Sequence, residues 1–195
     1  ARLNIKKNNY WKPKYKKIKK ISINECIEES RRLLSQSLKL RIRSDVPIAI
    51  CLSGGVDSCG LASLLVKDFD HKGKTFSIID DDPRYDETEN INAVLNDLNL
   101  KNTKIKLNPA NFLDDLKEQI IYHNAPVATI SSHVHYLLAK SINNDGYKVA
   151  ISGVAADEIY TGYYDHYLQH LEACQNSELF EDNFKNWNNF IKDNI

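Results

Sequence analysis

Short apolar runs alternate with amphipathic stretches along most of the chain. Residues 48–52 (Ile-Ala-Ile-Cys-Leu) form an unbroken apolar run, which is typical of a strand buried on both faces of a parallel sheet. Strands are also predicted at residues 75–79, 103–107 and 147–151, with helices between them at 58–69, 86–98, 109 onward and 130–144. Strands and helices that alternate at this spacing predict an α/β fold, with an open parallel sheet and helices on both faces.

Two more helical patterns flank this region. Ser22 and Glu25 have the spacing of a capping box, and the amphipathic pattern that follows predicts a helix to about residue 43. Pro47 disfavours helix at the residue before it, so this helix ends ahead of the first strand. Beyond residue 175 the chain is polar and rich in Asn, and its aromatic residues recur at near-helical spacing (Phe180, Phe184, Trp187 and Phe190).

Positive charge is concentrated at the beginning of the chain. Residues 1–20 contain nine Lys or Arg, no acidic residue and no helical or strand period. We predict a basic linker from a preceding domain over residues 1–20, with contact to RNA or a membrane surface as the alternative. Since the net charge of the whole chain is zero, residues 21–195 are acidic in balance, which argues against a nucleic-acid partner. These residues are predicted to form one domain.

Composition narrows the class of protein further. Hydrophobic residues make up 42% of the chain, which is enough for a core. No apolar run approaches the ~20 residues of a membrane span, and the first residues lack a signal-peptide pattern, so no membrane partner is predicted. Four cysteines occur without a C-x-x-C pair, which favours a reducing, cytoplasmic location.

The first candidate site follows the strand at 48–52. Residues 53–58 (Ser-Gly-Gly-Val-Asp-Ser) join that strand to a helix, so their backbone N–H groups and the helix N-terminus form an anion cradle. A Walker A loop is excluded because Leu61 and Ala62 stand where Lys and Ser or Thr are required. No G-x-G-x-x-G dinucleotide fingerprint is present either. A tight turn without a ligand is the alternative.

A second loop of similar character, residues 152–163, follows the strand at 147–151. It begins with Ser152 and Gly153 and contains Asp157. Ligands of open parallel sheets bind beyond the carboxyl ends of the strands, where the winding reverses. Two such loops could grip one nucleotide from both sides, with Asp57 and Asp157 sharing a magnesium ion on the triphosphate. Asp157 and Glu158 could instead cap the helix that follows.

In its motifs and their order, the chain resembles the synthetase domain of the asparagine synthetases. The resemblance implies the adenine-nucleotide α-hydrolase-like (ATP pyrophosphatase) fold. The resemblance covers about residues 10–164 and rests on residues 44–47, 53–58, 75–78, 85–87 and 152–163. It implies ATP and Mg²⁺ as cofactors, with Asp57 and Asp157 on the metal. It further implies ATP contacts at Leu52, Ser53, Gly54, Gly55, Val56, Asp57, Ser58, Ile78, Ser152 and Gly153.

The resemblance also implies an activity, that of a ligase. The carboxylate of a small-molecule substrate attacks the α-phosphorus of ATP and gives an acyl-adenylate and pyrophosphate. Ammonia that a glutaminase domain releases from glutamine then displaces AMP and leaves an amide. Neither nucleic acid nor membrane is an expected partner, and a homodimer is compatible with the resemblance.

Three departures from the family pattern keep alternatives open. Val154 stands where the family has an acid, so loss of catalysis in a nucleotide-binding module is one alternative. Ile130 stands where the family tends to carry arginine, which leaves carboxylates other than aspartate, such as a sugar uronic acid. Because the glutaminase cysteine and the C-terminal helical half are missing, we expect a fragment. A tRNA-thiolation, NAD- or GMP-synthetase-like activity predicts catalytic cysteines or an RNA surface, neither of which is visible.

Other polar residues suggest an acceptor pocket or a metal. Thr129, His133 and Glu158 are candidates for the acceptor pocket, with His135 as an alternative to His133. His166 and His170, four residues apart on a helix, are a rival metal site, but no Glu follows His166 and the H-E-x-x-H pattern fails.

Overall fold

The computed structural model describes residues 6–12 and 21–192, which divide into two compact units, residues 1–40 and 41–195. The first unit contains most of α1 (Ile23–Arg41). Its predicted capping box is confirmed: Ser22 N donates to Glu25 Oε2 at 2.7 Å, and Glu25 N donates to Ser22 Oγ at 3.2 Å. Most of the predicted basic linker, residues 1–5 and 13–20, lies outside the described residues, so the linker stays a prediction.

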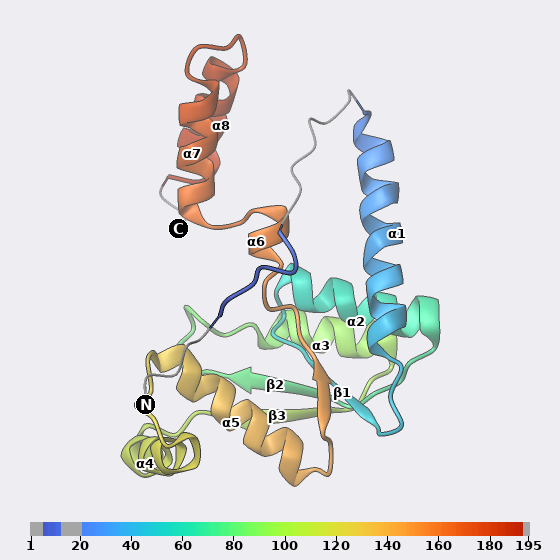
Figure 1. Cartoon of the computed structure of the whole chain (residues 1–195), viewed down its shortest axis with the longest axis vertical. Helices are drawn as coiled ribbons and strands as arrows, with labels where there is room; N and C mark the ends of the chain where they lie inside the picture. Colours follow the sequence, from blue (N-terminus) through green and yellow to red (C-terminus); the bar gives the residue numbers. More distant parts are fainter. Residues whose placement is uncertain (1–5, 13–20, 193–195) are drawn as a thin grey trace. The chain divides into compact units, whose positions relative to one another are not determined.

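The second unit is organised around one parallel sheet. Among the described residues it has four strands, in the order β3-β2-β1-β4 (Figure 1). Their bounds are β1 (Ile48–Cys51), β2 (Thr75–Ile79), β3 (Asn102–Lys106) and β4 (Val149–Ile151). The chain proceeds outward from β1 to β3 and then returns to the far side of β1 for β4. The winding therefore reverses between β1 and β4.

Helices lie on both faces of this sheet, so the predicted fold class is confirmed. α2 (Val56–Phe69) and α3 (Thr88–Leu98) pack together on one face (Figure 1). On the other face α5 (Ile130–Asn144) packs against β2 and β3, and α4 (Phe112–His123) packs beside it. A short 3₁₀ turn, Pro109–Asn111, leads into α4. The Asn108 side chain caps this turn by accepting from Ala110 N at 3.1 Å, and Pro109 occupies its first position.

The core lies around the two central strands. Ala49 and Phe76 are fully buried, and Ile142 of α5 packs with them. The ring of Phe76 meets Tyr147 edge to face at 5.7 Å. β4 is less covered, since its residue Val149 is exposed. The buried strand β1 therefore holds the loop that follows it on a rigid support.

Among the described residues, three helices follow β4: α6 (Asp157–Tyr160), α7 (Tyr164–Cys174) and α8 (Phe180–Phe190). The last two pack against each other, and Trp187 of α8 lies 6.5 Å from Tyr164 of α7 between ring centroids. The helical pattern predicted for the C-terminal aromatic residues is thus confirmed. Within the described part of the chain, no helix has the length and apolarity that crossing a membrane demands.

Candidate nucleotide-binding site

The loops after β1 and β4 lie at the point where the winding of the sheet reverses. β1 and β4 pair in parallel, with Ile50 opposite Ile151, so the two loops leave the same edge of the sheet side by side. Crevices of this kind are the usual ligand sites of open α/β sheets. The topology therefore brings together the two loops that the sequence singles out.

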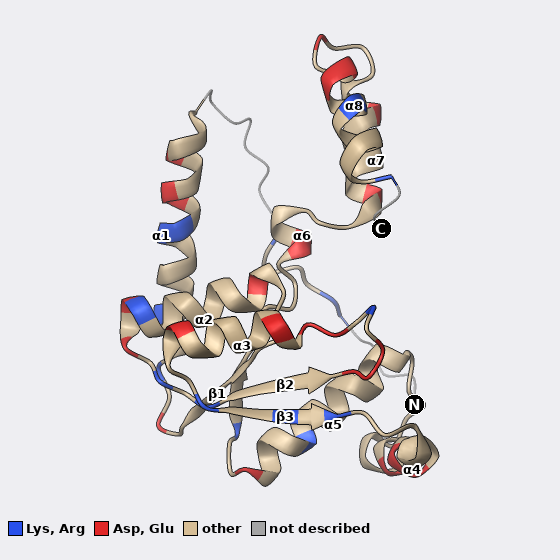
Figure 2. Ribbon diagram, turned by 180° about the vertical axis from the view of Figure 1, so that it is seen from behind, with Lys and Arg blue, Asp and Glu red and all other residues tan. Residues whose placement is uncertain are grey.

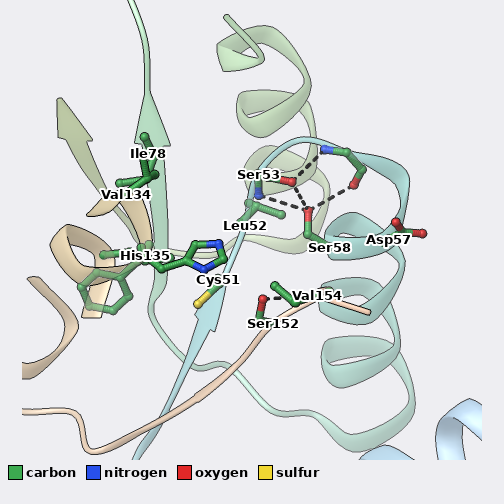
Figure 3. A pocket seen from close by; sticks show the side chains of 14 residues that line it. Cys51, Leu52, Ser53, Asp57, Ser58, Ile78, Val134, His135, Ser152 and Val154 are labelled. Carbon is green, nitrogen blue, oxygen red and sulfur yellow. Dashed lines mark hydrogen bonds between the residues drawn. The ribbon is translucent and has the colours of Figure 1, made fainter. Parts of the chain in front are cut away.

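The first loop is held by the Ser58 side chain, which is only 6% exposed (Figure 3). The Ser58 hydroxyl donates to Gly55 O at 3.1 Å and accepts from Ser53 N at 3.1 Å. It also lies 3.0 Å from Ser53 Oγ. Since its single proton serves Gly55 O, the Ser53 hydroxyl donates in this contact. The loop therefore has a fixed shape before any ligand binds.

Glycine is required at position 54 of this loop. Gly54 has a φ of +88°, and a Cβ atom there would lie 2.8 Å from Glu87 Cβ and 3.2 Å from Ile91 Cγ1. The positive φ and the close approach of α3 each exclude a side chain. Burial raises the pKa of the neighbouring Glu87 carboxyl. Glu87 belongs to a run of acidic residues between β2 and α3, red in Figure 2.

The second loop packs directly on the first. A Cβ atom at Gly153 would lie 3.0 Å from Ser58 N and 3.2 Å from Asp57 Cβ. The Ser152 hydroxyl accepts from Val154 N at 3.3 Å, which shapes the start of this loop. The second loop thus lies against the first turn of α2. The N–H groups of a first helical turn have no intrahelical partners.

A cavity of about 280 Å³ opens between these loops and α5. Most of the predicted ATP contacts line it: Leu52, Ser53, Gly55, Asp57, Ser58, Ile78, Ser152 and Gly153. Gly54 and Val56 are not in its wall: Gly54 faces α3, and the Val56 side chain is exposed. The remaining lining residues are Cys51, Phe76, Val134, His135, Leu138 and Val154. Burial raises the pKa of the Cys51 thiol.

The two predicted magnesium ligands have different surroundings. Asp57 is in the first turn of α2 and lines the cavity, although Figure 3 draws its carboxylate pointing away from the other labelled side chains. The carboxylate of Asp157 lies against Gly162, and Asp157 is not in the cavity wall. No cluster of three or more metal-ligating His, Cys, Asp or Glu side chains is found among the residues that the structure describes. The shared metal site stays a prediction.

The predicted acceptor residues do not line this cavity. The Thr129 hydroxyl caps α5 by accepting from Ser132 N at 3.2 Å. His133 is 6% exposed and meets Phe112 edge to face at 4.9 Å, inside the packing of α4 on α5. Glu158 accepts a hydrogen bond from the Tyr163 hydroxyl at 3.0 Å. Their role in binding a substrate therefore stays a prediction without support from the cavity.

α5 supplies three lining residues, of which only His135 was predicted from the sequence, as an alternative to His133. Val134, His135 and Leu138 share one side of this helix and close the cavity opposite the loops. Their spacing of one, three and four residues is that of one helical face, which is the signal that could have found them. His135 also lines a second hollow, a groove of about 1010 Å³ between α4 and α5.

Within the described part of the chain, the rival histidine pair belongs to no group of three or more metal-ligating side chains. His166 Nδ1 accepts from Gly162 N at 3.2 Å, and its ring lies 5.2 Å from that of Tyr163. His170 contacts the thiol of Cys174, with its Nε2 3.7 Å from Sγ. The first histidine thus shapes the loop before α7, and the second lies on that helix.

Solved structures that align with this chain include a synthetase and a tRNA thiolase. An NH3-dependent NAD synthetase from Campylobacter jejuni aligns with a TM-score of 0.40 and 16% identity, covering 84% of this chain and 88% of that one. The U34-tRNA thiolase NcsA from Methanococcus maripaludis aligns with a TM-score of 0.43 and 16% identity, covering 78% and 54%. Because both scores are low, the fold is defined by this chain's own strand order.

Sequence comparison is more informative. An asparagine synthetase (glutamine-hydrolyzing) from Bacillus subtilis is 28% identical over 79% of this chain, and a putative one from Methanocaldococcus jannaschii is 30% identical over 83%. The amidase chyE of Penicillium rubens is 27% identical over 73%. The chain spans only 24%, 31% and 23% of the lengths of these relatives. The sequence model of the asparagine synthase family matches residues 29–192, and the chain belongs to this family.

Proposed function

We propose that this chain is the nucleotide-binding part of an ATP-dependent, AMP-forming amide synthetase. In the proposed reaction a small-molecule carboxylate attacks the α-phosphorus of ATP, pyrophosphate leaves, and ammonia then displaces AMP to form an amide. The contact of Gly153 with the backbone at Ser58 is the observation that carries the proposal. It joins two loops at the switch point of the sheet in a chain of the asparagine synthase family.

The two ends of the cavity suit different parts of ATP. Leu52, Ile78 and Leu138 give one side an apolar wall that fits the adenine and ribose. The loop of residues 53–58 offers backbone N–H groups and the positive end of the α2 dipole to the phosphates. A loop that Ser58 already holds in shape needs little reorganisation when the pyrophosphate gains charge.

The carboxylates of Asp57 and Asp157 are ligands of the kind that magnesium prefers. Proteins commonly bind this ion through one or two carboxylates and substrate phosphates. In the proposal Asp57 holds the ion and Asp157 joins it from the second loop. Bound there, Mg²⁺ would neutralise charge on the departing pyrophosphate. For Asp157 this requires its carboxylate to leave the neighbourhood of Gly162.

The remaining features of the proposal concern the surroundings of the site. In the proposal, ammonia comes from glutamine through a glutaminase domain. Two of the asparagine synthetase relatives are named as glutamine-hydrolyzing. The acceptor is a small carboxylic acid, the protein works in the cytoplasm, and neither nucleic acid nor membrane takes part. The proposal is compatible with a homodimer.

Pyrophosphate release tests this function. The chain is incubated with ATP, Mg²⁺, ammonium chloride and one carboxylic acid at a time, with aspartate and uronic acids among them. Ammonium chloride removes any dependence on glutamine. We expect acid-dependent pyrophosphate release and formation of the matching amide. If no acid releases pyrophosphate from a chain that binds ATP, the synthetase proposal is wrong.

A second candidate function is a nucleotide-binding module without catalysis. Val154 favours it, because this exposed valine, which lines the cavity where the family has an acid, offers no group that could accept a proton. Val154→Glu distinguishes the two candidates: a synthetase gains or keeps amide formation, whereas a binding module still releases no pyrophosphate. Ile130, where the family tends to carry arginine, keeps open an acceptor other than aspartate.

A further inference from the structure

Amide formation requires a group that takes a proton. When ammonia attacks the carbonyl carbon of an acyl-adenylate, a C–N bond forms and the C–O bond to AMP breaks. The nitrogen arrives with three hydrogens and keeps two in the amide, so one proton must leave. A side chain that accepts it in the transition state accelerates this step. Val154 cannot serve, because its side chain is aliphatic.

Among the residues described as lining the cavity, three have side chains that titrate: Cys51, Asp57 and His135. Burial raises the pKa of the Cys51 thiol, which keeps it protonated at neutral pH and unable to accept a proton. The carboxylate of Asp57 points away from the other labelled side chains in Figure 3. His135 is left as the group that projects into the cavity and can accept a proton.

The position of His135 fits this task. Its ring lies in the middle of the labelled side chains in Figure 3, between the Ile78–Val134 side and the Ser152–Val154 side. The same side chain lines the groove of about 1010 Å³ between α4 and α5. His135 thus lies where the nucleotide cavity and this groove meet, and it is exposed to both. A group at this junction can touch both a nucleotide in the cavity and a second substrate that enters along the groove.

We propose that His135 is the catalytic base of the amidation step, a role that rests on the proposed function. A neutral ring nitrogen of His135 accepts one proton from the attacking nitrogen as the C–N bond forms. The electron pair of the breaking C–O bond leaves with AMP, and the imidazolium releases its proton to solvent. Imidazole suits this exchange because its charge changes between about pH 5 and 8.

Other titratable groups surround His135 and must be considered in any pH profile. From β1 and α2 the cavity adds Cys51 and Asp57. From α4 and α5 the groove adds Glu118, Tyr122, His123, Tyr136 and Lys140. Lys140 is paired with Glu118 at 2.5 Å and lies 3.8 Å from Asp115, so these three groups together carry one net negative charge.

The variants His135→Gln and His135→Asn test the proposal, with His170→Gln as the matched control. His170 is an exposed histidine on α7 that lines neither the nucleotide cavity nor the groove. Pyrophosphate and amide are measured together with ATP, Mg²⁺, ammonium chloride and the best acceptor acid. We expect pyrophosphate release to continue in the His135 variants, while the amide formed per pyrophosphate falls 10²-fold or more, in the range of lost general-base catalysis.

Two further results are expected. Added imidazole restores part of the amide formation in His135→Gln. Melting temperatures of all variants stay close to that of the unaltered chain, because His135 is exposed.

The outcomes separate this proposal from the proposed function. An unchanged ratio of amide to pyrophosphate in both His135 variants would overturn the role of His135 and leave the synthetase intact. Equal loss of amide in His170→Gln would also overturn it. Absence of pyrophosphate release from the unaltered chain would overturn the proposed function and this inference together.

Discussion

Gly153 lies against the backbone of Ser58, so that a Cβ atom at position 153 would be 3.0 Å from the Ser58 nitrogen. The two residues are 95 positions apart and belong to loops that follow neighbouring parallel strands. The contact fixes the distance between the two loops, and with it the width of the cavity at the end that we propose for the phosphates. A side chain at position 153 must therefore push the second loop away from the first.

Gly153→Ala is expected to weaken ATP binding by at least tenfold without unfolding the chain. Gly60→Ala is the matched control, because a Cβ atom there would have nothing within 4 Å on the exposed side of α2. Alanine favours a helix over glycine, so this control should gain about 0.4–1 kcal/mol of stability. Titration calorimetry with ATP and thermal unfolding measure both effects. Equal ATP affinity in Gly153→Ala and the unaltered chain would show that the two loops do not bind one nucleotide.

Local patterns in the sequence predicted the four described strands within two residues, and the helices expected at 58–69, 86–98 and 130–144 equally closely. The helix expected from residue 109 begins instead with a 3₁₀ turn, and α4 starts at Phe112. The apolar run at 48–52 gave β1, and the helix expected at residues 130–144 has these bounds in the structure. Both cases rest on residues close in sequence: β-branched side chains in one, and a Thr129 cap with a terminating Gly146 in the other. The point where the winding of the sheet reverses could be predicted as well, because alternating strands and helices permit few topologies.

The sequence did not predict which side chains of the site point into the cavity. His133 and His135 are two residues apart on α5, so they point about 200° apart around the helix. The sequence pattern cannot tell which of them faces the cavity, since both neighbour apolar residues. Packing against Phe112 takes His133 into the core and leaves His135 for the cavity. The position of Asp157 against Gly162 likewise depends on a loop in which Thr161 has a φ of +68°.

Gly54→Ala should destabilise the chain more than Gly146→Ala. Both glycines have a φ of +88°, so each alanine incurs the left-handed strain of about 1–2 kcal/mol. At position 146 a Cβ atom has nothing within 4 Å, whereas at position 54 it would lie 2.8 Å from Glu87 Cβ. Only Gly54→Ala should also lower ATP affinity. Chemical denaturation and ATP titration measure the two effects, and an equal loss of stability in both variants would contradict the close packing of α3 on the loop.

The raised pKa of Glu87 predicts a pH-dependent effect of Glu87→Gln. Burial raises the pKa, so the charged carboxylate is less favourable in the folded chain than in the unfolded one. This destabilisation is absent below the ordinary pKa of 4.5 and grows as the pH rises through the raised value. Glu89→Gln is the control, because Glu89 is likewise an exposed acid at the N-terminus of α3, whereas Glu87 in addition lies against Gly54. Both variants lose a similar interaction with the helix dipole.

We therefore expect Glu87→Gln to be more stable than Glu89→Gln at pH 7, with the difference disappearing below pH 4.5. Urea denaturation of both variants at a series of pH values measures this difference. If the difference in stability persists unchanged at pH 3.5, it arises from lost contacts and not from the charge of Glu87.

Cys51 offers a test of the binding site that needs no catalysis. Its thiol lines the nucleotide cavity, and burial raises its pKa, so N-ethylmaleimide should modify it slowly at pH 7 and faster as the pH rises. ATP at ten times its dissociation constant should slow this modification about tenfold, because only the free fraction of the protein reacts. Cys174 lies on α7 outside the cavity and serves as the internal control, since ATP should leave its modification rate unchanged.

Mass spectrometry of the digested protein measures the modification of both cysteines in one sample. Protection of Cys51 without protection of Cys174 places the nucleotide between the loops after β1 and β4. Equal protection of both thiols indicates a general tightening of the chain and not occupancy of the cavity. If ATP binds and protects neither thiol, the nucleotide site lies elsewhere in the chain, and the functions proposed for Asp57, Ser58 and His135 fail together.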